Sequence, residues 1–492
     1  MHLSESTLSA LPPSVAGPVR RPAGVGIVHL GLGAFHRAHQ VAYTDDALLH
    51  AGPAAAGMGI CAVSLKTPGA RDRLAPQDGL YTLIEKSPEG VRRRVLGSLV
   101  EVRFLGEERH EVHARLAARE TAIVSLTITE KGYGHDPATG ALNPAHPEIA
   151  PDFADPAHPR SAVGLIAAAL DARRLSHGTP FTVLCCDNLP HNGKLVRGLV
   201  LEYARRRDEA LAHWIDRHVT FPSTMVDRIV PATTDADIAE NDAALGLIDA
   251  APVVCEPFRQ WVIEDAFVAG RPPWEAAGAE LVDDVAPFEA MKLRLLNGSH
   301  SALAYLGYLA GHEFIYQVAS EPAFATFMRA LMGEAVPTLR VPASVNLSAY
   351  RDTLATRFVN PALPHRTKQI AMDGSQKLPQ RLLGTVRDCL AAGRPITRLA
   401  LAVAAWMRYV GGRDESGRAI EVADPLASTF ASIADAHRGD PAAHARALLG
   451  LTAVFGDDLP QDPRFTRPVT AWLESLHAHG AARTVRDCNA RP

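Results

Sequence analysis

The sequence has few cysteines, and no two of them stand in a Cys-x-x-Cys pattern. Its six cysteines are scattered along 492 residues, at positions 61, 185, 186, 255, 389 and 488. This spacing offers neither a disulfide framework nor a four-thiolate zinc site. We therefore expect the protein to work in a reducing compartment, the cytoplasm.

Long apolar segments and an excess of charge of one sign are also missing. No uncharged apolar run reaches the roughly 18 residues that would indicate a membrane-spanning helix. The polar, proline-containing N-terminus lacks the apolar core of a secretory signal, and we expect residues 1–24 to form a loose arm. Fifty Lys plus Arg against 54 Asp plus Glu give a net charge of -4, which predicts no binding to nucleic acid or to an anionic membrane.

What is present is the composition of an ordinary globular protein, with 47% hydrophobic, 21% charged and 6% aromatic residues. Short apolar runs typical of strands stand at 25–30, 59–65, 81–85, 94–102, 121–129 and 181–187. Helical patterns alternate with the later runs, and beyond Pro287 only helical patterns remain. The sequence therefore predicts an α/β fold, with a Rossmann-type doubly wound domain at 1–286 and a mostly α-helical domain at 287–492.

A glycine pair follows the first of these strands and precedes a helical pattern, which is the setting of a dinucleotide-binding turn. Gly31 permits a tight turn, and Gly33 lets the backbone approach a pyrophosphate at the start of the helix. The predicted cofactor-binding residues are Gly31, Gly33, Ala34, Phe35 and His36. His36 stands where a third glycine is usual, and no acidic residue follows the second strand, so these residues leave NAD and NADP open. The alternative is a strand-to-helix turn without a ligand.

Several other chemistries lack their residues. The Tyr-x-x-x-Lys pair of short-chain dehydrogenases and the His-Glu-x-x-His pattern of zinc hydrolases are both absent. His36 and His39 are three residues apart, but a polar helix face explains them more simply than a metal does. We expect no metal site.

Four polar side chains of the segment from Glu289 to His300 share one arc of a mostly apolar helical pattern. At about 100° per residue, with Lys292 at zero, Glu289 lies near 60°, His300 near 80° and Asn297 near 140°. A partly buried lysine on such a face can accept a proton, and Asn297 can donate to a developing alkoxide. His300 can bind a substrate hydroxyl. The alternative is a solvated stripe on an amphipathic helix.

Asn188 follows the strand at 181–187 directly, and ligands bind at the carboxyl ends of strands in doubly wound sheets. It can share the substrate oxygen with Asn297, so that the two amides form a two-donor site. Alternatively, Asn188 caps a helix that begins near Gly193.

Seven segments, in this order along nearly the whole chain, are similar to the polyol-specific long-chain dehydrogenase/reductase family that includes mannitol 2-dehydrogenase. They are GLGAFHRAHQ, SLTITEKGY, CDNLPHNGK, FPSTMVDRIVPATT, EPFRQWVIEDAF, MKLRLLNGSHSALAYLG and HRTKQIAMDGSQKLPQR. Within the family, EPFRQWVIED and the last segment most resemble fructuronate reductase, also called D-mannonate oxidoreductase. The resemblance implies NAD as the cofactor, an active site to which both domains contribute, and hydride transfer without a metal.

The resemblance also implies roles for individual residues. The implied catalytic residues are Lys292, Asn188, Asn297 and His300. The residues implied in proton passage are Glu130 and Glu289, and Asp227 is implied in substrate contact. In mannitol-type members an arginine stands eight positions before the lysine of the DGS-x-K motif. Here Gln369 stands at that position before Lys377, and this weakens the mannitol interpretation.

A uronate carries a carboxylate that a polyol lacks, and Arg366 and Lys377 are candidate cationic partners for it, with Gln369 in the same substrate-binding set. We therefore expect the protein to interconvert D-fructuronate and D-mannonate. We also expect it to be a monomer or a weak oligomer. The alternatives are oxidation of mannitol or arabinitol to a ketose and, from another class, a nucleotide-dependent sugar sensor without turnover.

Overall fold

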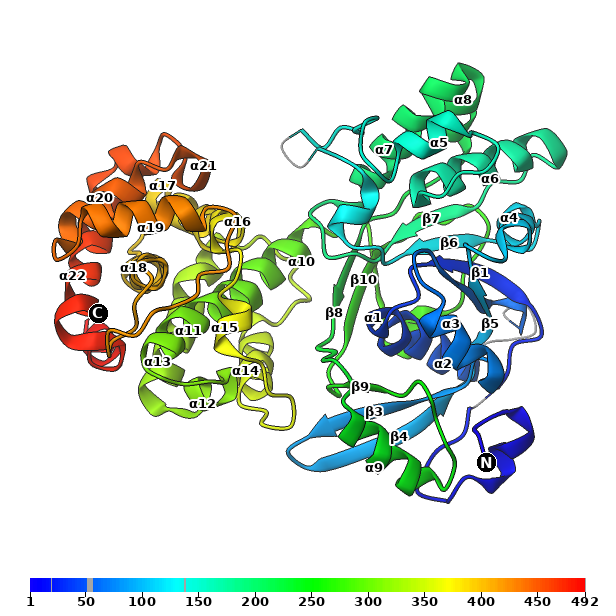
Figure 1. The fold of residues 1–492 in the computed structure, drawn as a ribbon, viewed down its shortest axis with the longest axis horizontal. Helices are drawn as coiled ribbons and strands as arrows, with labels where there is room; N and C mark the ends of the chain where they lie inside the picture. Colours follow the sequence, from blue (N-terminus) through cyan, green and yellow to red (C-terminus); the bar gives the residue numbers. More distant parts are fainter. Residues whose placement is uncertain (19, 51–55, 137–138, 492) are drawn as a thin grey trace. The chain divides into compact units, whose positions relative to one another are not determined.

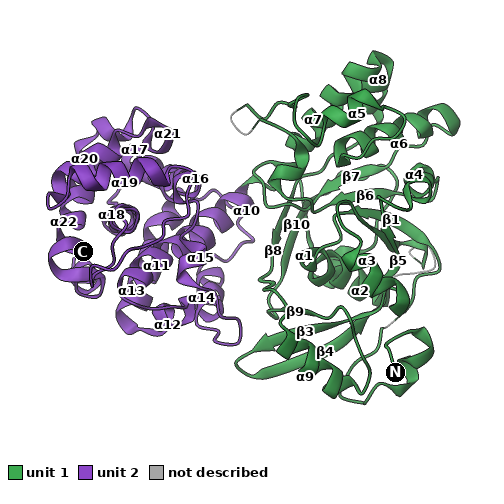
Figure 2. Cartoon of the chain, in the orientation of Figure 1, with its two compact units in different colours: residues 1–286 green, residues 287–492 purple. Residues whose placement is uncertain are grey.

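The chain forms two compact units, Met1–Ala286 and Pro287–Pro492, which Figure 2 shows in green and purple. The computed structural model describes residues 1–18, 20–50, 56–136 and 139–491. The first unit is built around sheets, and the second around helices (Figure 1).

A five-stranded parallel sheet forms the centre of the first unit. Its strands lie in the order β5-β2-β1-β6-β7. When these five strands are numbered by their order along the chain, this is 3-2-1-4-5. The strands are β1 (Val25–Leu30), β2 (Gly59–Ser64), β5 (Leu99–Phe104), β6 (Ile123–Leu126) and β7 (Thr182–Cys185). Every residue of β1 is buried, as expected of a central strand covered on both faces. The strand order confirms the predicted Rossmann-type doubly wound sheet.

Helices cover the sheet, and apolar clusters fill both of its faces. On one face, side chains of α4, α6 and α7, such as Val112, Leu165 and Leu199, pack against β6 and β7. On the other face, Val41 of α2 packs in a cluster that includes Trp261. The helices of this unit are α1 (Ala34–Ala38), α2 (Gln40–His50), α3 (Gly69–Leu74), α4 (Arg109–Ala117), α5 (Ala150–Ala154), α6 (Ala162–Ser176), α7 (Asn192–Arg207), α8 (Glu209–His218) and α9 (Asp235–Leu245).

The predicted single strand at 94–102 is wrong, because the chain changes sheets within it. It divides into β4 (Gly90–Leu96) and β5, and the carboxylate of Asp45 accepts the amides of Gly97 and Ser98 at 2.8 and 3.0 Å. Two three-stranded sheets that the sequence did not predict lie beside the central one, in the orders β4-β3-β9 and β11-β10-β8. Their other strands are β3 (Tyr81–Ser87), β8 (Thr224–Asp227), β9 (Val253–Cys255), β10 (Gln260–Glu264) and β11 (Glu280–Val282).

The predicted loose N-terminal arm is also wrong. Leu3 is fully buried and its amide donates to the carbonyl of Ile248 at 2.9 Å. Leu3 and Val15 pack with Leu80 and Leu245 in a small apolar cluster of their own. A few well-placed apolar side chains therefore fix a segment whose composition is largely polar.

The second unit is helical, and residues 287–491 contain no strand, which confirms the prediction for this half. Helix α18 (Thr397–Val410) is almost wholly buried and packs against α11 (Gly298–Leu309) and α22 (Pro463–Asn489). The remaining helices are α12 (Ile315–Ser320), α13 (Pro322–Ala335), α14 (Leu347–Phe358), α15 (Thr367–Ile370), α16 (Gly374–Leu378), α17 (Gly384–Ala391), α19 (Ala427–Ala436), α20 (Pro441–Leu449) and α21 (Thr452–Phe455). Helix α10 (Ala286–Met291) runs from the last residue of the first unit into the second.

Two π-helical segments interrupt the α-helices of the second unit. They are η6 (Lys292–Asn297), between α10 and α11, and η8 (Pro379–Leu383), between α16 and α17. The angular positions predicted for Asn297 and His300 relative to Lys292 are therefore wrong, because a π-helix turns less per residue than an α-helix. The two segments pack together where Gly298 lacks a side chain: a Cβ there would lie 2.8 Å from the carbonyl oxygen of Arg381.

Candidate active site

The loops that follow β1, β6 and β7 carry most of the first unit's predicted site residues. β1 lies between β2 and β6, where the order of the strands reverses, and such a switch point is the usual ligand site of a doubly wound sheet. Gly31 follows β1, Glu130 follows β6 and Asn188 follows β7. The Thr127 hydroxyl donates to the Gly31 carbonyl at 2.9 Å and joins the first two loops. The sheet thus brings these three predicted positions to one edge.

The glycine turn has the geometry that a dinucleotide requires. Gly31 has a φ of +105°, and a Cβ on it would overlap the backbone carbonyl of Thr127. Gly33 occupies the N-cap of α1, and a Cβ there would meet only the Gly31 carbonyl oxygen, at 3.9 Å. Gly31 is therefore needed for the packing of two strands, whereas Gly33 leaves an open backbone surface on which a pyrophosphate can rest.

The side chain of His36 lies under the turn. It is buried and stacked on His29, with ring centroids 3.4 Å apart, and neither ring nitrogen has a hydrogen-bond partner among the described residues. Burial lowers the pKa of His36 well below its ordinary value and that of His29 to about 3, so both rings are neutral. His36 can therefore contact a cofactor through its backbone only.

Acidification is expected to destabilise the protein through His39, at the junction of α1 and α2. Burial lowers the pKa of this histidine to about 3, and its Nε2 donates to the Gln260 carbonyl at 2.9 Å. At pH 5 the folded state keeps His39 neutral, whereas the unfolded chain, with the ordinary pKa of 6.5, binds a proton. The free energy of unfolding should therefore fall by about 2 kcal/mol between pH 7.5 and pH 5 on account of this residue.

Urea unfolding at the two pH values measures this loss. In His39→Gln the loss should be smaller than in the wild type by about 2 kcal/mol, because the titrating group is gone while other groups contribute equally to both proteins. The same loss in both proteins would contradict the expectation.

Asp187 holds the loop that carries Glu130. Its carboxylate accepts the amides of Ile128 and Thr129 at 2.8 and 3.0 Å and the hydroxyl of Tyr133 at 2.6 Å. Thr129 has a φ of +64°. This conformation costs a β-branched residue about 1–3 kcal/mol and persists only where the surroundings enforce it. Asp187 enforces this conformation and so sets the direction in which the exposed Glu130 leaves the sheet.

Asn192 fixes the neighbouring loop, which carries Asn188. Its amide nitrogen donates to the carbonyls of Asp187 and Thr224, both at 2.9 Å, and its oxygen accepts the Thr224 amide at 2.9 Å. Asn188 is exposed at the edge of the sheet, and Asp227, at the end of β8, is 5% exposed. The alternative that Asn188 caps α7 is wrong, since His191 occupies the N-cap and no side chain bonds there.

Sequence reasoning missed both of these positioning residues. Asp187 and Asn192 stand in the motif that supplied Asn188, and the signal was the unusual density of short polar side chains directly after a buried strand. Their partners lie far along the chain, so the sequence did not show what they bind.

In the second unit, one helical stretch carries four of the predicted residues. Glu289 lies on α10, Lys292 and Asn297 are the first and last residues of η6, and His300 lies in the first turn of α11. Lys292 is only 7% exposed. The π-helix thus contains two of the predicted catalytic residues, which is the setting in which such segments are often found.

Basic side chains surround His300. Its ring lies 5.6 Å from that of His365 and 5.3 Å from that of Phe358, measured between centroids. Burial lowers the pKa of His300 well below its ordinary value, and the nearby positive charges of Arg381 and Lys377 act in the same direction. Lys377 and Arg381 therefore lie near enough to His300 to act on its charge.

The other two predicted substrate-binding residues of this unit are exposed. Arg366 forms an ion pair with Glu313 and lies over the ring of Phe314 at 5.2 Å. It lines a groove of about 620 Å³ together with Glu313 and Lys368. Gln369 is exposed on α15. The described contacts do not bring Arg366 or Gln369 to His300.

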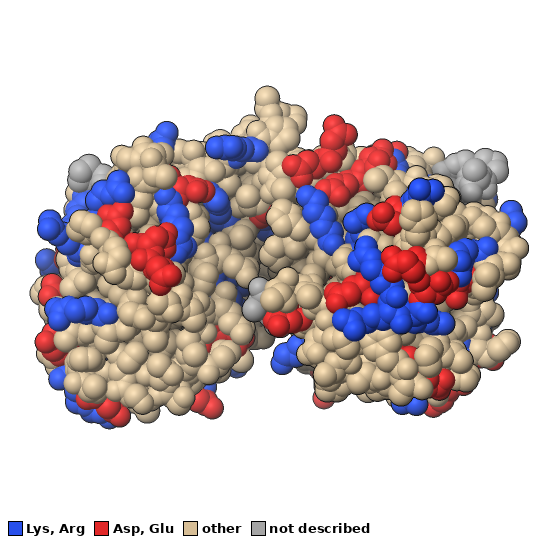
Figure 3. Space-filling model, turned by 90° about the horizontal axis from the view of Figure 1, so that it is seen from above, with Lys and Arg blue, Asp and Glu red and all other residues tan. Residues whose placement is uncertain are grey.

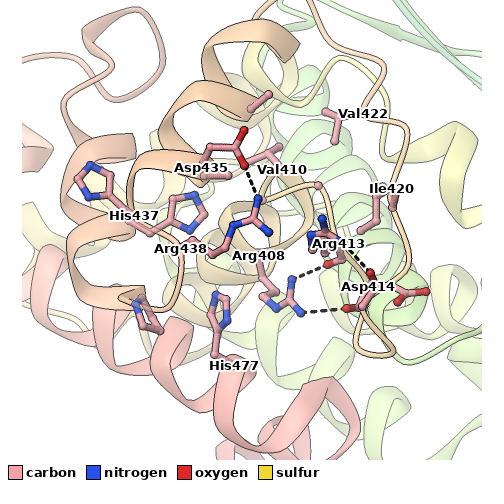
Figure 4. Close-up of a pocket in the computed structure, with 18 of the residues that line it drawn as sticks. Arg408, Val410, Arg413, Asp414, Ile420, Val422, Asp435, His437, Arg438 and His477 are labelled. Carbon is pink, nitrogen blue, oxygen red and sulfur yellow. Dashed lines mark hydrogen bonds and ion pairs between the residues drawn. The ribbon is translucent and has the colours of Figure 1, made fainter.

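A further cavity, of about 600 Å³, lies among α18, α19 and the segment between them (Figure 4). Arg408 donates there to the carbonyl of Asp414 at 3.2 Å, and Arg438 pairs with Asp435 at 2.5 Å. None of the predicted site residues lines this cavity. It is not a candidate for the active site.

The described residues show no sign of a metal site, of a membrane-spanning helix or, on the face drawn in Figure 3, of a broad patch of charge of one sign. No cluster of three or more His, Cys, Asp or Glu side chains in that part of the chain is arranged to hold a metal ion. No described helix combines the length and the apolar character needed to cross a membrane. On the face drawn in Figure 3, basic and acidic side chains of the described residues are interspersed without a broad patch of one sign.

A doubly wound unit with an open glycine turn, followed along the chain by a helical unit with a buried lysine, defines a two-domain dehydrogenase. The chain belongs to the mannitol dehydrogenase family: residues 25–276 match its Rossmann domain and residues 284–477 its C-terminal domain. This finding confirms the resemblance that the sequence motifs indicated.

Individual relatives cover almost the whole chain. D-mannonate oxidoreductase of Escherichia coli strain K12 is 49% identical over 464 residues, which are 93% of this chain and 94% of that protein. Mannitol 2-dehydrogenase of Pyrenophora tritici-repentis strain Pt-1C-BFP is 41% identical over 490 residues, 98% of this chain and 85% of that protein. The structure of Pseudomonas fluorescens mannitol 2-dehydrogenase in a ternary complex with NAD and D-mannitol is similar over the whole of both chains, with a TM-score of 0.85 and 39% identity.

Proposed function

We propose that this protein is an NAD-dependent oxidoreductase that interconverts D-fructuronate and D-mannonate. The observation that carries the proposal is the group of basic side chains around His300, because a sugar acid needs cationic partners that a polyol does not. The likeness to D-mannonate oxidoreductase supports it.

NAD is proposed because the glycine turn fits a dinucleotide and because the similar Pseudomonas fluorescens structure is a complex with NAD. The residues proposed to hold it are Gly31, Gly33, Ala34, Phe35 and His36. When bound, the nicotinamide supplies or accepts the hydride at C4. We place the reacting carbon of the sugar acid at C5, the ketone carbon of fructuronate.

The chain's own residues then manage the proton and the oxygen. In the direction of reduction, Lys292 supplies the proton to the oxygen on C5, while the amides of Asn188 and Asn297 donate to that oxygen as charge develops. His300, neutral because it is buried, binds a neighbouring hydroxyl. Solvent protons are proposed to pass through Glu130 and Glu289, and Asp227 to contact the substrate.

The alternative is oxidation of mannitol or a related polyol to a ketose. The identity of 39 to 41% with mannitol 2-dehydrogenases favours it. Gln369, in place of the arginine of mannitol-type members, argues against it.

A panel assay tests the two functions against each other. The oxidation of NADH is followed with fructuronate, tagaturonate, fructose and xylulose, and the first is repeated with NADPH. We expect kcat/KM for fructuronate to exceed that for fructose by at least about a hundredfold, because one charge-assisted hydrogen bond contributes roughly 1.5–3 kcal/mol, a factor of about 10–150. Equal turnover of fructose would restore the polyol interpretation, and a preference for NADPH would contradict the cofactor.

A further inference from the structure

Arg381 is held beside the residue that follows His300. It lies in η8, whose backbone approaches the start of α11 at Gly298. From there its Nη1 donates to the hydroxyl of Ser301 at 3.0 Å. The guanidinium is therefore fixed next to the predicted substrate-binding histidine by the packing of two π-helical segments and by one hydrogen bond.

The charge of Arg381 is not neutralised. Within residues 139–491, which the structure describes without a gap, no carboxylate forms an ion pair with it. Burial lowers the pKa of Arg381, which shows that the surroundings disfavour its charged form. A partly buried cation without a counter-charge is costly to maintain, and such a group is a candidate for a site where a ligand supplies the missing charge.

The other basic candidates are already engaged with acidic groups. Arg366 is paired with Glu313. Lys377 donates to the Met372 carbonyl at 2.6 Å, and the carboxylates of Asp373 and Asp424 lie close enough to favour its charged form. Of the three, Arg381 is the one that can accept a new anion without displacing an old one.

The surroundings of His300 provide further donors. Its Nε2 is buried and has no hydrogen-bond partner among the described residues. Arg357, which is 8% exposed, lies close enough to His300 and His365 to hold the pKa of both rings down in addition to the effect of burial. The buried Nε2 of His300 can therefore bond to an oxygen of an anionic ligand.

We propose that Arg381 binds the carboxylate of the sugar-acid substrate while His300 binds a hydroxyl between this carboxylate and the reacting carbon. Ser301 occupies one arm of the guanidinium, and the other nitrogens remain for the two carboxylate oxygens. The inference rests on the proposed function, since that function makes the substrate a uronate.

Substitution of Arg381 tests the inference in the full-length protein. Arg381→Met removes the charge but keeps an unbranched, flexible stem, and Arg381→Lys keeps the charge but loses the fork of donors. Arg387→Met is the matched control, because it removes an exposed guanidinium of α17 that is paired with Asp458. Calorimetry in the presence of NADH, with which neither alcohol can react, gives the Kd of D-mannonate and of D-mannitol, and steady-state assays give kcat and KM for fructuronate and fructose. Thermal midpoints show whether each variant is folded.

In Arg381→Met we expect the Kd of mannonate and the KM of fructuronate to rise by about 10- to 100-fold, because a charge-assisted contact is lost in ground state and transition state alike. The kcat for fructuronate, the Kd of mannitol and the kinetics with fructose should change by less than about threefold. Arg381→Lys should lie between this variant and the wild type, and Arg387→Met should match the wild type.

The outcomes separate the inference from the proposed function. If the wild type prefers fructuronate and Arg381→Met keeps that preference, the inference is overturned and the function stands. If the wild type shows no preference in turnover but loses mannonate affinity in Arg381→Met, the function fails and the carboxylate site is supported. Equal weakening of mannonate and mannitol would overturn the inference, because it would show a structural role.

Discussion

Replacement of Lys292 by alanine is expected to lower kcat near neutral pH by about 10²–10⁴-fold, since a positioned acid or base contributes a factor of that size. Lys292 is only 7% exposed and opens the π-helix that ends at Asn297. Without its amine, the proton for the substrate oxygen has to come from water. The Kd of NADH should change little, because the glycine turn belongs to the other unit.

Three measurements complete this test. NADH binding is followed by its fluorescence, single-turnover rates give the chemical step, and added methylamine should restore part of the activity because it replaces the lost amine. Lys368→Ala is the control, since Lys368 is an exposed lysine of the same unit that is paired with Glu421. Activity of Lys292→Ala within about tenfold of the wild type would remove Lys292 from the mechanism.

Alanine at Gly31 and alanine at Gly33 are expected to have opposite consequences. A Cβ at Gly31 would overlap the Thr127 carbonyl and sits at a φ of +105°, so β1 and β6 must separate to accept it. We expect a loss of more than about 4 kcal/mol in the free energy of unfolding, or a protein that does not fold. At Gly33 a Cβ meets only an oxygen at 3.9 Å, and stability should change by less than about 0.5 kcal/mol.

Binding of the cofactor distinguishes the second variant. Gly33→Ala fills the surface on which a pyrophosphate would rest, and we expect the Kd of NADH to rise at least about tenfold, because displacement of one good backbone contact costs about 1.4 kcal/mol or more. Urea unfolding and NADH titration of the two variants measure both effects. A Gly33→Ala protein that binds NADH as the wild type does would place the dinucleotide elsewhere.

The sequence predicted those parts of the fold that depend on continuous local patterns. The strands of the central sheet are runs of apolar, β-branched residues, and the helices of the second unit follow a regular apolar period. Motifs with a fixed order along the chain identified the family.

The features that the sequence did not show depend on contacts between distant residues. The break of the strand at 94–102 is set by Asp45, and the order of the N-terminal arm by the burial of Leu3. Arg381 stood in a quoted motif, but only the folded chain shows that it lacks a counter-charge. No local pattern marks a π-helix, since its residues are those of an ordinary helix.

The π-helix at Lys292–Asn297 also makes the helix sensitive to its exact number of residues. A π-helical turn can be regarded as one residue inserted into an α-helix, accommodated by a local widening. Deletion of one residue here would remove the widened turn, and the side chains from Lys292 to Asn297 would take new positions around the helix axis although the flanking helices keep their relative phase. Substitutions can vary the chemistry of this segment, whereas an insertion or a deletion would change the positions of its side chains around the helix axis. Lineages that keep the reaction are therefore expected to keep the spacing from Lys292 to His300 without gaps.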